Sequence, residues 1–233
     1  GEIIGVDYDT VERSNLNRQF LFDENDLGKL KTDTTREKIK NINPEITMTT
    51  YNLEITQYEQ LLPIIKGADV VLNMMDQPSI ISLRWVNAAC VKLNIPYYSG
   101  GVNNQFIRLE RITPNKGEPC YDCSLIHNMK SSIDFVFRLK AYYGQTLSNV
   151  NTGFAPNISL LTGLMIADIT KLLTGISPIT KPVITFDLVS MKLEQWNHET
   201  EALKSCPTCS GGLHQLTTLE ELLIITEKER LRA

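Results

Sequence analysis

The chain has 233 residues and a mass of 26.3 kDa, enough for one sizeable core, which excludes a disordered chain and a small disulfide-stapled protein. Its hydrophobic share of 42% and charged share of 21% are near the averages of globular proteins. The 23 basic and 27 acidic residues give a net charge of −4, which argues against nucleic acid as the main partner but leaves room for an anionic substrate at a local site.

The first half of the chain alternates short apolar runs with helical patterns. We predict strands over residues 1–7, 46–52, 69–75 and 96–99, and helices over residues 31–42, 58–66 and 78–93. The runs at 1–7 and 69–75 are apolar enough for strands buried on both faces. Strands that alternate with helices of this length indicate βαβ crossovers, so we expect an α/β fold with a Rossmann-like, doubly wound, mostly parallel sheet.

The second half differs in style. Residues 105–113 and 183–196 alternate like longer strands, which predicts a mixed or antiparallel extension of the sheet. Between them lie a polar crossover and an apolar window at 159–173. Asp168 and Lys171 interrupt this window, so we interpret it as a buried core helix and expect no membrane partner. Residues 1–212 would form the main domain, and residues 213–233 a C-terminal helical tail beyond Gly211–Gly212.

Four of the five cysteines form two pairs with the spacing of metal-binding knuckles. Cys120 and Cys123 make the first pair, and Cys206 and Cys209 the second. Two residues between thiolates allow both sulfurs to reach one tetrahedral zinc, and two such pairs complete a closed, structural four-sulfur site. Disulfides or free thiols are the alternatives. The remaining cysteine, Cys90, lies among apolar residues and is expected to be an inert core residue.

A dense polar segment follows the first predicted strand. Asp7 stands where the acid of a nucleotide-binding βαβ unit contacts ribose, and Arg18 follows with Asn15 and Gln19 as candidates for phosphate contact. Lys31 could add a second cation at a helix start. A polar surface loop and a solvated helix face would explain the same residues. Asp76 ends the other buried strand, at the edge of the sheet where a magnesium ligand is expected.

Taken together, these segments resemble the MoeB/ThiF/HesA family of adenylating enzymes, which are related to ubiquitin-activating enzymes. The resemblance rests on D-x-D-x-V-E-x-S-N-L-N-R-Q-F-L-F at residues 7–22, D-x-G-x-x-K at 26–31, N-I-N-P at 41–44, the strand ending at Asp76, and both cysteine pairs. It covers about residues 1–212. The motif at residues 7–22 is long and specific.

The resemblance implies ATP-dependent attack by a carboxylate on the α-phosphate, which gives an acyl adenylate and pyrophosphate. The usual substrate is the carboxyl terminus of a peptide or of a small ubiquitin-like or sulfur-carrier protein. By matching position, the nucleotide contacts would be Asp7, Ser14, Asn15, Arg18, Gln19, Lys31 and Gln77, with Asp76 holding Mg²⁺. Arg18, Lys31 and Asp76 would carry catalysis. The family also implies ATP and structural Zn²⁺ as cofactors, a homodimer and a cytoplasmic location.

Three departures from the family pattern bear on this interpretation. Only six residues precede Asp7, whereas a strand and a Gly-rich phosphate loop normally come first. The chain does not begin with Met, so we expect a trimmed or partial product whose native form carries that loop. The usual Asp-Asn is Asp76–Gln77 here. No cysteine lies between Ser124 and Ser205, which disfavours a thioester-forming step in the crossover.

Two branches and one rival class remain open. The absence of a crossover cysteine and the phrase G-F-A-P-N at residues 153–157 resemble the MccB-type branch, which adenylates a peptide. The same features fit a MoeB-like activator of a sulfur-carrier protein. The rival is a non-catalytic ThiF-like subunit that binds a leader peptide or a catalytic partner. True absence of the glycine loop would favour that rival.

Overall fold

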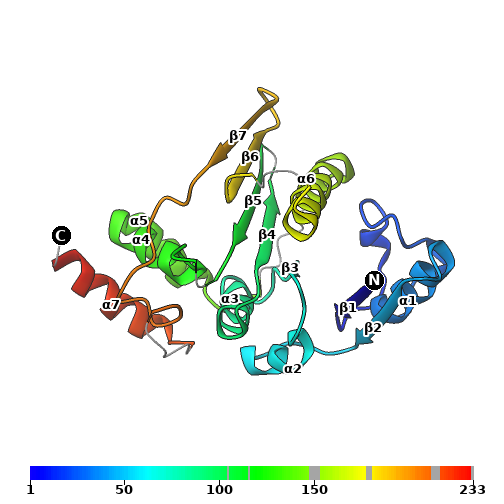
Figure 1. Ribbon diagram of the computed structural model, residues 1–233, viewed down its shortest axis with the longest axis horizontal. Helices are drawn as coiled ribbons and strands as arrows, with labels where there is room; N and C mark the ends of the chain where they lie inside the picture. Colours follow the sequence, from blue (N-terminus) through cyan, green and yellow to red (C-terminus); the bar gives the residue numbers. More distant parts are fainter. Residues whose placement is uncertain (104, 115, 147–152, 177–179, 211–215, 232–233) are drawn as a thin grey trace. The chain divides into compact units, whose positions relative to one another are not determined.

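The computed structural model describes residues 1–103, 105–114, 116–146, 153–176, 180–210 and 216–231. The chain divides into two compact units. Unit 1 comprises residues 1–56 and 152–160, and unit 2 comprises residues 57–151 and 161–233. Figure 1 labels the helices and strands of both units. The C-terminal boundary predicted at residue 212 lies among residues outside the described ranges and stays a prediction.

Unit 1 is built around one parallel pair of strands. Strands β1 (Glu2–Val6) and β2 (Thr47–Tyr51) are joined by helix α1 (Lys31–Ile42), and their register runs from Glu2 opposite Thr47 to Val6 opposite Tyr51. This is the βαβ crossover that the sequence predicts. The expectation of a fully buried first strand is wrong, since Ile3 and Ile4 are 41% and 39% exposed. One helix packed against a two-stranded sheet covers only part of the surface of the sheet.

Unit 2 contains a five-stranded mixed sheet. Its strands are β3 (Val71–Asn73), β4 (Tyr97–Val102), β5 (Phe106–Ile112), β6 (Val183–Asp187) and β7 (Lys192–Trp196), and they lie in the order β3-β4-β5-β6-β7. The β3–β4 pair is parallel and the other three pairs are antiparallel. The predicted α/β fold with a mixed extension is therefore confirmed.

Three strand predictions in unit 2 need correction. The segment predicted as one strand over 183–196 is a hairpin, because the chain reverses between Asp187 and Lys192, where Met191 has a φ of 56°. Strand β3 has three residues rather than seven, and it is not fully buried, since Leu72 is 39% exposed. Strand β4 continues past the predicted end through Gly100, whose α-hydrogen faces Leu161 and Met165 of helix α6. A Cβ there would lie 2.9 Å from Leu161 Cδ1, so a larger residue would force the Leu161 side chain to shift.

Six helices among the described residues belong wholly or mostly to unit 2. They are α2 (Leu61–Ile65), α3 (Ile81–Leu93), α4 (Tyr121–Ser131), α5 (Ile133–Tyr142), α6 (Ala155–Thr174) and α7 (Leu219–Leu231), with α6 beginning in residues assigned to unit 1. Helices α4 and α5 occupy the segment predicted as a polar crossover. Helix α7 lies within the predicted tail and packs on α4, and its Leu219 and Leu222 share one apolar cluster with Leu125 of α4 and Leu139 of α5.

Helix α6 differs from the predicted buried core helix. By length and composition it could cross a membrane, but such a test also selects core helices, and only 22% of its apolar window is buried. One face is buried: Leu161, Met165, Asp168 and Ile169. The opposite face is open, with Ile166 52% exposed. The predicted full burial is wrong because a helix that lies on one face of a sheet buries only the stripe of side chains that faces the sheet.

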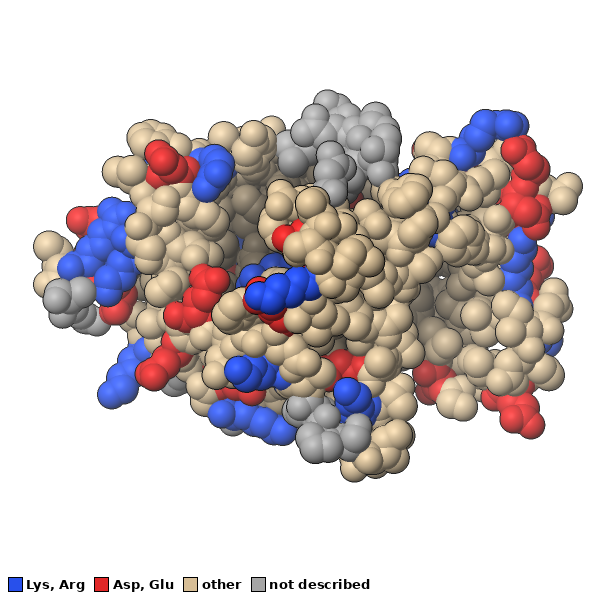
Figure 2. Space-filling view, turned by 90° about the horizontal axis from the view of Figure 1, so that it is seen from above, with Lys and Arg blue, Asp and Glu red and all other residues tan. Residues whose placement is uncertain are grey.

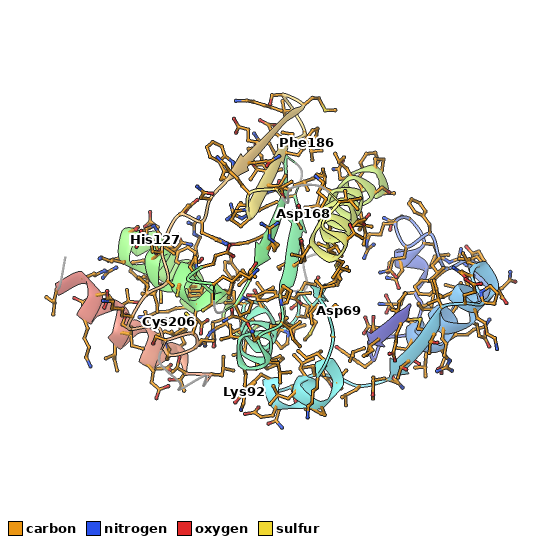
Figure 3. All side chains as sticks on the ribbon, viewed as in Figure 1. Asp69, Lys92, His127, Asp168, Phe186 and Cys206 are labelled. Carbon is orange, nitrogen blue, oxygen red and sulfur yellow. The ribbon has the colours of Figure 1, made fainter. Side chains whose placement is uncertain are left out.

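Asp168 joins this helix to the sheet. In Figure 3 it lies on the side of α6 that faces β4 and β5. Its carboxylate accepts hydrogen bonds from Tyr98 Oη at 2.9 Å and from Arg111 Nη1, and Thr180 donates through its backbone amide at 3.0 Å and its hydroxyl at 2.6 Å. Burial acts to raise the pKa of Asp168, but these hydrogen bonds and the Arg111 charge outweigh it and hold the pKa below its usual value.

Candidate functional site

The segment that follows β1 carries six of the predicted nucleotide contacts, all in unit 1. Asp7 comes directly after the carboxyl end of β1, and its Oδ1 accepts a hydrogen bond from the amide of Asp9 at 2.8 Å. The amide of Asp7 donates to Tyr51 O at 3.2 Å, which ties the start of the loop to β2. The acid is therefore fixed at the sheet edge where nucleotide-binding folds place their ligands.

Arg18 is held on this loop by short-range contacts. A 3₁₀ helix spans Arg13–Asn15, and Arg18 Nη1 donates to Ser14 O and to Asn17 Oδ1, each at 2.9 Å. The Arg18 side chain also lies against Gly153, where a Cβ would be 2.5 Å from Arg18 Cδ. Asn17 Nδ2 donates to Gly153 O at 3.3 Å. The sequence did not connect Gly153 with Arg18, because 134 residues separate them.

Asn15 and Gln19 are partly turned into the loop itself. Asn15 is buried, and its Oδ1 accepts from the amide of Glu12 at 3.0 Å, so one of its polar groups is used to close the turn. The side-chain oxygen of Gln19 is buried and has no hydrogen-bond partner among the described residues. A buried polar atom without a partner is costly unless a ligand or water completes it. The side chain of Gln19 therefore has hydrogen-bonding capacity that contacts within the loop do not use.

Lys31 begins helix α1 and already has an anionic partner. Its Nζ lies 2.7 Å from Asp9 Oδ2, and its backbone amide donates to Asp9 O at 3.0 Å. The lysine side chain is 13% exposed and the Asp9 side chain 50% exposed. A phosphate that binds Lys31 would thus share the ammonium group with Asp9. The sequence did not single out Asp9, although its position two residues after Asp7 offered the signal.

The D-x-G-x-x-K stretch is built around Asp26. Asp26 accepts from the amide of Asp23 at 3.0 Å and pairs with Lys29 at 3.3 Å and with Lys38 of α1. The hydrogen bond from Lys38 is the main cause that lowers the pKa of Asp26 to about 2. Gly28 has a φ of 80°, a conformation that favours glycine. This stretch anchors the loop to α1 and so fixes the position of Lys31, the first residue of that helix.

The other two predicted nucleotide contacts, Asp76 and Gln77, belong to unit 2. They follow β3, and the Asp76 side chain is exposed. Just before them, Asn73 is buried, and its Oδ1 accepts from the amide of Met75 at 3.1 Å. The predicted roles of all eight residues stay predictions, six of them gathered in one loop of unit 1 and two placed after the parallel strand of unit 2.

The four paired cysteines converge in unit 2. Cys120 precedes α4, Cys123 lies in its first turn, and Figure 3 places Cys206 beside α3 and α4. All four sulfurs lie within 4.8 Å of one another, with Cys120–Cys206 at 3.6 Å, Cys123–Cys209 at 3.4 Å and Cys120–Cys123 at 4.0 Å. Sulfurs bonded to one tetrahedral zinc would be about 3.8 Å apart, whereas a disulfide needs about 2.05 Å.

The donor set therefore fits a closed zinc site and not the disulfide alternative. Hydrogen bonds among the four thiols lower the pKa of Cys123 and of Cys209 and raise the pKa of Cys120 and of Cys206. Cys90 is fully buried, and burial raises the pKa of its thiol to about 12. This agrees with its expected inert role in the core.

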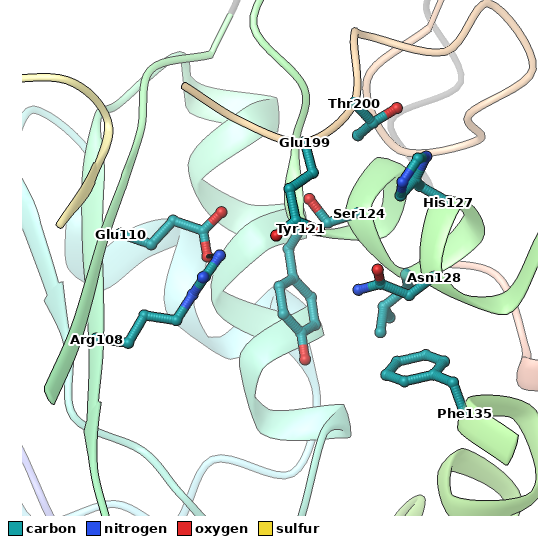
Figure 4. Close-up of a pocket in the computed structure, with 10 residues that line it drawn as sticks. Arg108, Glu110, Tyr121, Ser124, His127, Asn128, Phe135, Glu199 and Thr200 are labelled. Carbon is teal, nitrogen blue, oxygen red and sulfur yellow. Dashed lines mark ion pairs between the residues drawn. The ribbon is translucent and has the colours of Figure 1, made fainter. Parts of the chain in front are cut away.

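A pocket of about 280 Å³ opens on unit 2 between β5, α4 and the start of α5 (Figure 4). Arg108 and Glu110 of β5 line one side, with their charged groups 3.7 Å apart, and Phe135 lines the other. Glu110 is also 3.2 Å from Nδ1 of the buried His198. Charged and aromatic groups at opposite walls could hold a peptide side chain. The sequence did not predict this pocket, because its residues come from four separate segments.

The surface charges are mixed rather than gathered by sign. In Figure 2, acidic and basic side chains are interspersed over the visible face. Exposed pairs such as Lys192–Glu194 and Arg230–Glu227 show the same arrangement. A nucleic-acid-binding protein usually presents a continuous basic patch. The prediction that nucleic acid is not the main partner stays a prediction.

Comparison with known proteins gives one consistent family. The ThiF family model matches residues 1–208. The sulfur carrier protein ThiS adenylyltransferase of Escherichia coli is 28% identical over 215 residues, which cover 91% of this chain and 77% of that protein. The molybdopterin-synthase adenylyltransferase of Escherichia coli is 27% identical over 198 residues, which cover 84% of this chain and 72% of that protein.

Solved structures of Escherichia coli MccB are also similar. MccB with ATP has a TM-score of 0.71 and 28% identity, and the match covers 91% of this chain and 59% of the MccB chain. MccB with AMPCPP and MccA has a TM-score of 0.72 and 28% identity, with 91% and 60% covered. The present chain thus spans about three fifths of the MccB chains that it matches.

Proposed function

Because this chain belongs to the ThiF family, we propose that it is the adenylation domain of an ATP-dependent adenylyltransferase. An oxygen of a substrate carboxylate attacks the α-phosphorus of ATP, the bond from that phosphorus to the bridging oxygen breaks, and pyrophosphate leaves. The product is an acyl adenylate. The observation that carries this proposal is the loop of unit 1, where Asp7, Arg18 and Lys31 lie within 25 consecutive residues and a fixed hydrogen-bond framework holds them.

In this proposal the loop binds the nucleotide without supplying a nucleophile. Asp7 accepts hydrogen bonds from the ribose hydroxyls, and Ser14, Asn15 and Gln19 contact the triphosphate. Arg18 and Lys31 neutralise the charge that spreads over the phosphoryl oxygens. Holding the reactants in place and offsetting this charge are physically sufficient for such a displacement.

Two further roles, implied by the family resemblance, fall on residues of unit 2. Asp76 would hold Mg²⁺, with Gln77 near the nucleotide, and a bound Mg²⁺ supplies further neutralisation of phosphate charge. Cys120, Cys123, Cys206 and Cys209 would hold one zinc ion, as their sulfur separations support. A closed four-sulfur site has no open position, so its role is structural.

The substrate we propose is the carboxyl terminus of a peptide or of a small ubiquitin-like or sulfur-carrier protein. The named relatives support this class: one acts on the sulfur carrier ThiS, another is a SUMO-activating enzyme subunit 2 from Dictyostelium discoideum, and MccB has been solved with MccA. The absence of cysteine between Ser124 and Ser205 favours release of the adenylate without a thioester in the crossover. A homodimer and a cytoplasmic location remain expectations of the family resemblance.

The test is ATP–pyrophosphate exchange by the full-length protein with a panel of peptides and small carrier proteins that end in a free carboxylate. We expect exchange above background with at least one of them, and a loss of at least a hundredfold in Arg18→Ala. Arg13→Ala is the matched control, since Arg13 lies on the same loop in an exposed ion pair with Glu24. Exchange that stays at background with every substrate would refute the proposal. If the protein also fails to bind ATP, the result would favour a non-catalytic subunit.

A further inference from the structure

A buried arginine on α3 joins the two cysteine pairs. The side chain of Arg84 is fully buried, as is that of Asp122, and the two form a bidentate pair with Nε–Oδ1 at 2.8 Å and Nη2–Oδ2 at 2.9 Å. Asp122 lies between Cys120 and Cys123. Its Oδ2 also accepts from Thr208 Oγ1 at 2.6 Å, and Thr208 lies between Cys206 and Cys209. One carboxylate therefore connects both pairs and is itself held by Arg84.

The same guanidinium reaches the end of α5. Arg84 Nη1 donates to Tyr143 Oη at 2.5 Å and to Thr217 O at 2.8 Å, and the guanidinium lies 5.9 Å from the centre of the Tyr143 ring. A buried guanidinium with this many partners can occupy only one position without leaving a donor unpaired. The Tyr143 hydroxyl is therefore fixed relative to the cysteine cluster.

The residues next to Tyr143 hold the loop that follows β3. The amide of Gly144 donates to Ser79 O at 3.0 Å, and the amide of Ser79 donates to Gln145 O at 2.9 Å. Gly144 has a φ of 71°, which favours glycine at this turn. Ser79 stands two residues after Gln77, so this backbone pairing fixes the carboxyl side of the Asp76–Gln77 loop.

The loop needs such support. Ile80, the residue that precedes α3, has a φ of 66°. A β-branched residue strongly disfavours this conformation, and it persists only where surrounding contacts impose it. Around Ile80 those contacts are the Ser79–Gly144 pairing on one side and Arg84 on the other, whose amide donates to Ile80 O at 3.2 Å.

We propose that Arg84 and Tyr143 are positioning residues that tie the four-cysteine cluster to the Asp76–Gln77 loop. The connection runs from both cysteine pairs through Asp122 to Arg84, then through Tyr143 to the Ser79–Gly144 pairing. An ordered cluster holds the loop in the geometry that Asp76 needs to bind Mg²⁺, and a cluster without metal releases it. The role assigned to Asp76 rests on the proposed function, whereas the connection itself does not.

Hydrogen exchange tests the connection without any activity. In Tyr143→Phe, which removes only the hydroxyl, we expect the amides of Ser79 and Gly144 to exchange about tenfold faster or more, since a hydrogen bond to a charged group is lost. Tyr142→Phe, at the neighbouring position and 46% exposed, is the matched control and should leave both rates unchanged. Unchanged rates in Tyr143→Phe would overturn the proposal.

Metal removal tests whether the connection begins at the cluster. A zinc chelator should raise exchange at the same two amides in the wild type but add little in Tyr143→Phe, where the connection is already broken. Equal effects of the chelator in both proteins would refute the coupling. Arg84→Lys, which keeps the charge but loses the bidentate fork, should act as Tyr143→Phe does.

Kinetics of the full-length protein then connect the loop to the reaction. We expect Tyr143→Phe to raise the Mg²⁺ concentration at half-maximal pyrophosphate exchange about fivefold or more, while its zinc content stays near wild type and its urea midpoint falls only by the loss of one buried hydrogen bond. A purely structural role would lower stability without this shift in Mg²⁺ dependence, and that outcome would refute positioning. If amide exchange becomes faster in Tyr143→Phe but neither the wild type nor any variant exchanges pyrophosphate, the connection is supported and the proposed function is refuted.

Discussion

The carboxylate of Asp168 should be one of the main stabilising groups of unit 2, and Asp168→Ala tests this directly. The side chains of Asp168 and Arg111 are each 3% exposed. Removing the carboxylate leaves the Arg111 guanidinium buried with Thr180 O as its remaining acceptor at 2.8 Å, and it takes away the partner of the Tyr98 hydroxyl. The variant thus creates a buried charge without compensation.

The magnitude follows from that uncompensated charge. Breaking a buried ion pair by removing one partner typically costs about 3–5 kcal/mol. Small domains are stable by about 5–15 kcal/mol, so Asp168→Ala should lose a large part of the free energy of unfolding. In the double variant Asp168→Ala/Arg111→Met no buried charge remains, so the combined loss should be smaller than the sum of the two single losses by about 1–3 kcal/mol.

Urea unfolding followed by tryptophan fluorescence reports on this unit, because Trp85 of α3 and Trp196 of β7 both belong to unit 2. The control is Asp69→Ala, at an exposed position of the same unit, which should change stability by no more than about 0.5 kcal/mol. A loss below about 1 kcal/mol in Asp168→Ala, or simple additivity in the double variant, would refute the reasoning.

Three further predictions concern acid stability, metal content and the Arg18 site. The pKa of Asp26 is about 2 in the folded protein and about 3.9 in the unfolded chain, so its stabilising contribution is complete above about pH 5 and is lost as the pH falls toward 2. In acid titrations followed by circular dichroism, Asp26→Asn should therefore lose less stability between pH 5 and pH 2.5 than the wild type or Asp33→Asn. The purified protein should hold about one zinc per chain by metal analysis, and Cys209→Ser but not Cys90→Ala should lose it; retention in Cys209→Ser would contradict the four-sulfur site. Gly153→Ala should weaken ATP binding about tenfold by calorimetry on the full-length protein, because the new Cβ would displace Arg18, whereas Gly163→Ala, with open space at its Cβ position, should bind as the wild type does.

The loop of unit 1 could be predicted from the sequence because its information is local. Asp7, Arg18 and Lys31 lie in one segment directly after a strand, and hydrogen bonds within the segment fix them. The cysteine pairs are local as well, since two residues between thiols already suggest a shared ligand. The α/β class followed from strands alternating with helices. These features can be predicted without knowledge of the rest of the fold.

The crossover helices could not be predicted in the same way. Helices α4 and α5 carry Lys, Asp, Ser and Asn among their apolar residues, so the pattern of a half-buried helix is weak in the sequence. Packing against α7 stabilises these segments as helices, and the partners Leu219 and Leu222 lie some 90 residues further along the chain. The pattern of apolar residues within one segment does not indicate which distant segment packs against it.

What the sequence by itself determined is therefore the family, the loop that we propose binds the nucleotide, and the two cysteine pairs that could share one metal ion. Only the tertiary structure decided that Arg84 meets Asp122 and Tyr143, that Asp168 meets Arg111 across 57 positions, and that Gly153 lies against Arg18. The physical reason is that a buried charge needs partners at fixed distances in space. Those partners come from distant segments, and no local pattern of residues specifies which segments the packed core brings together.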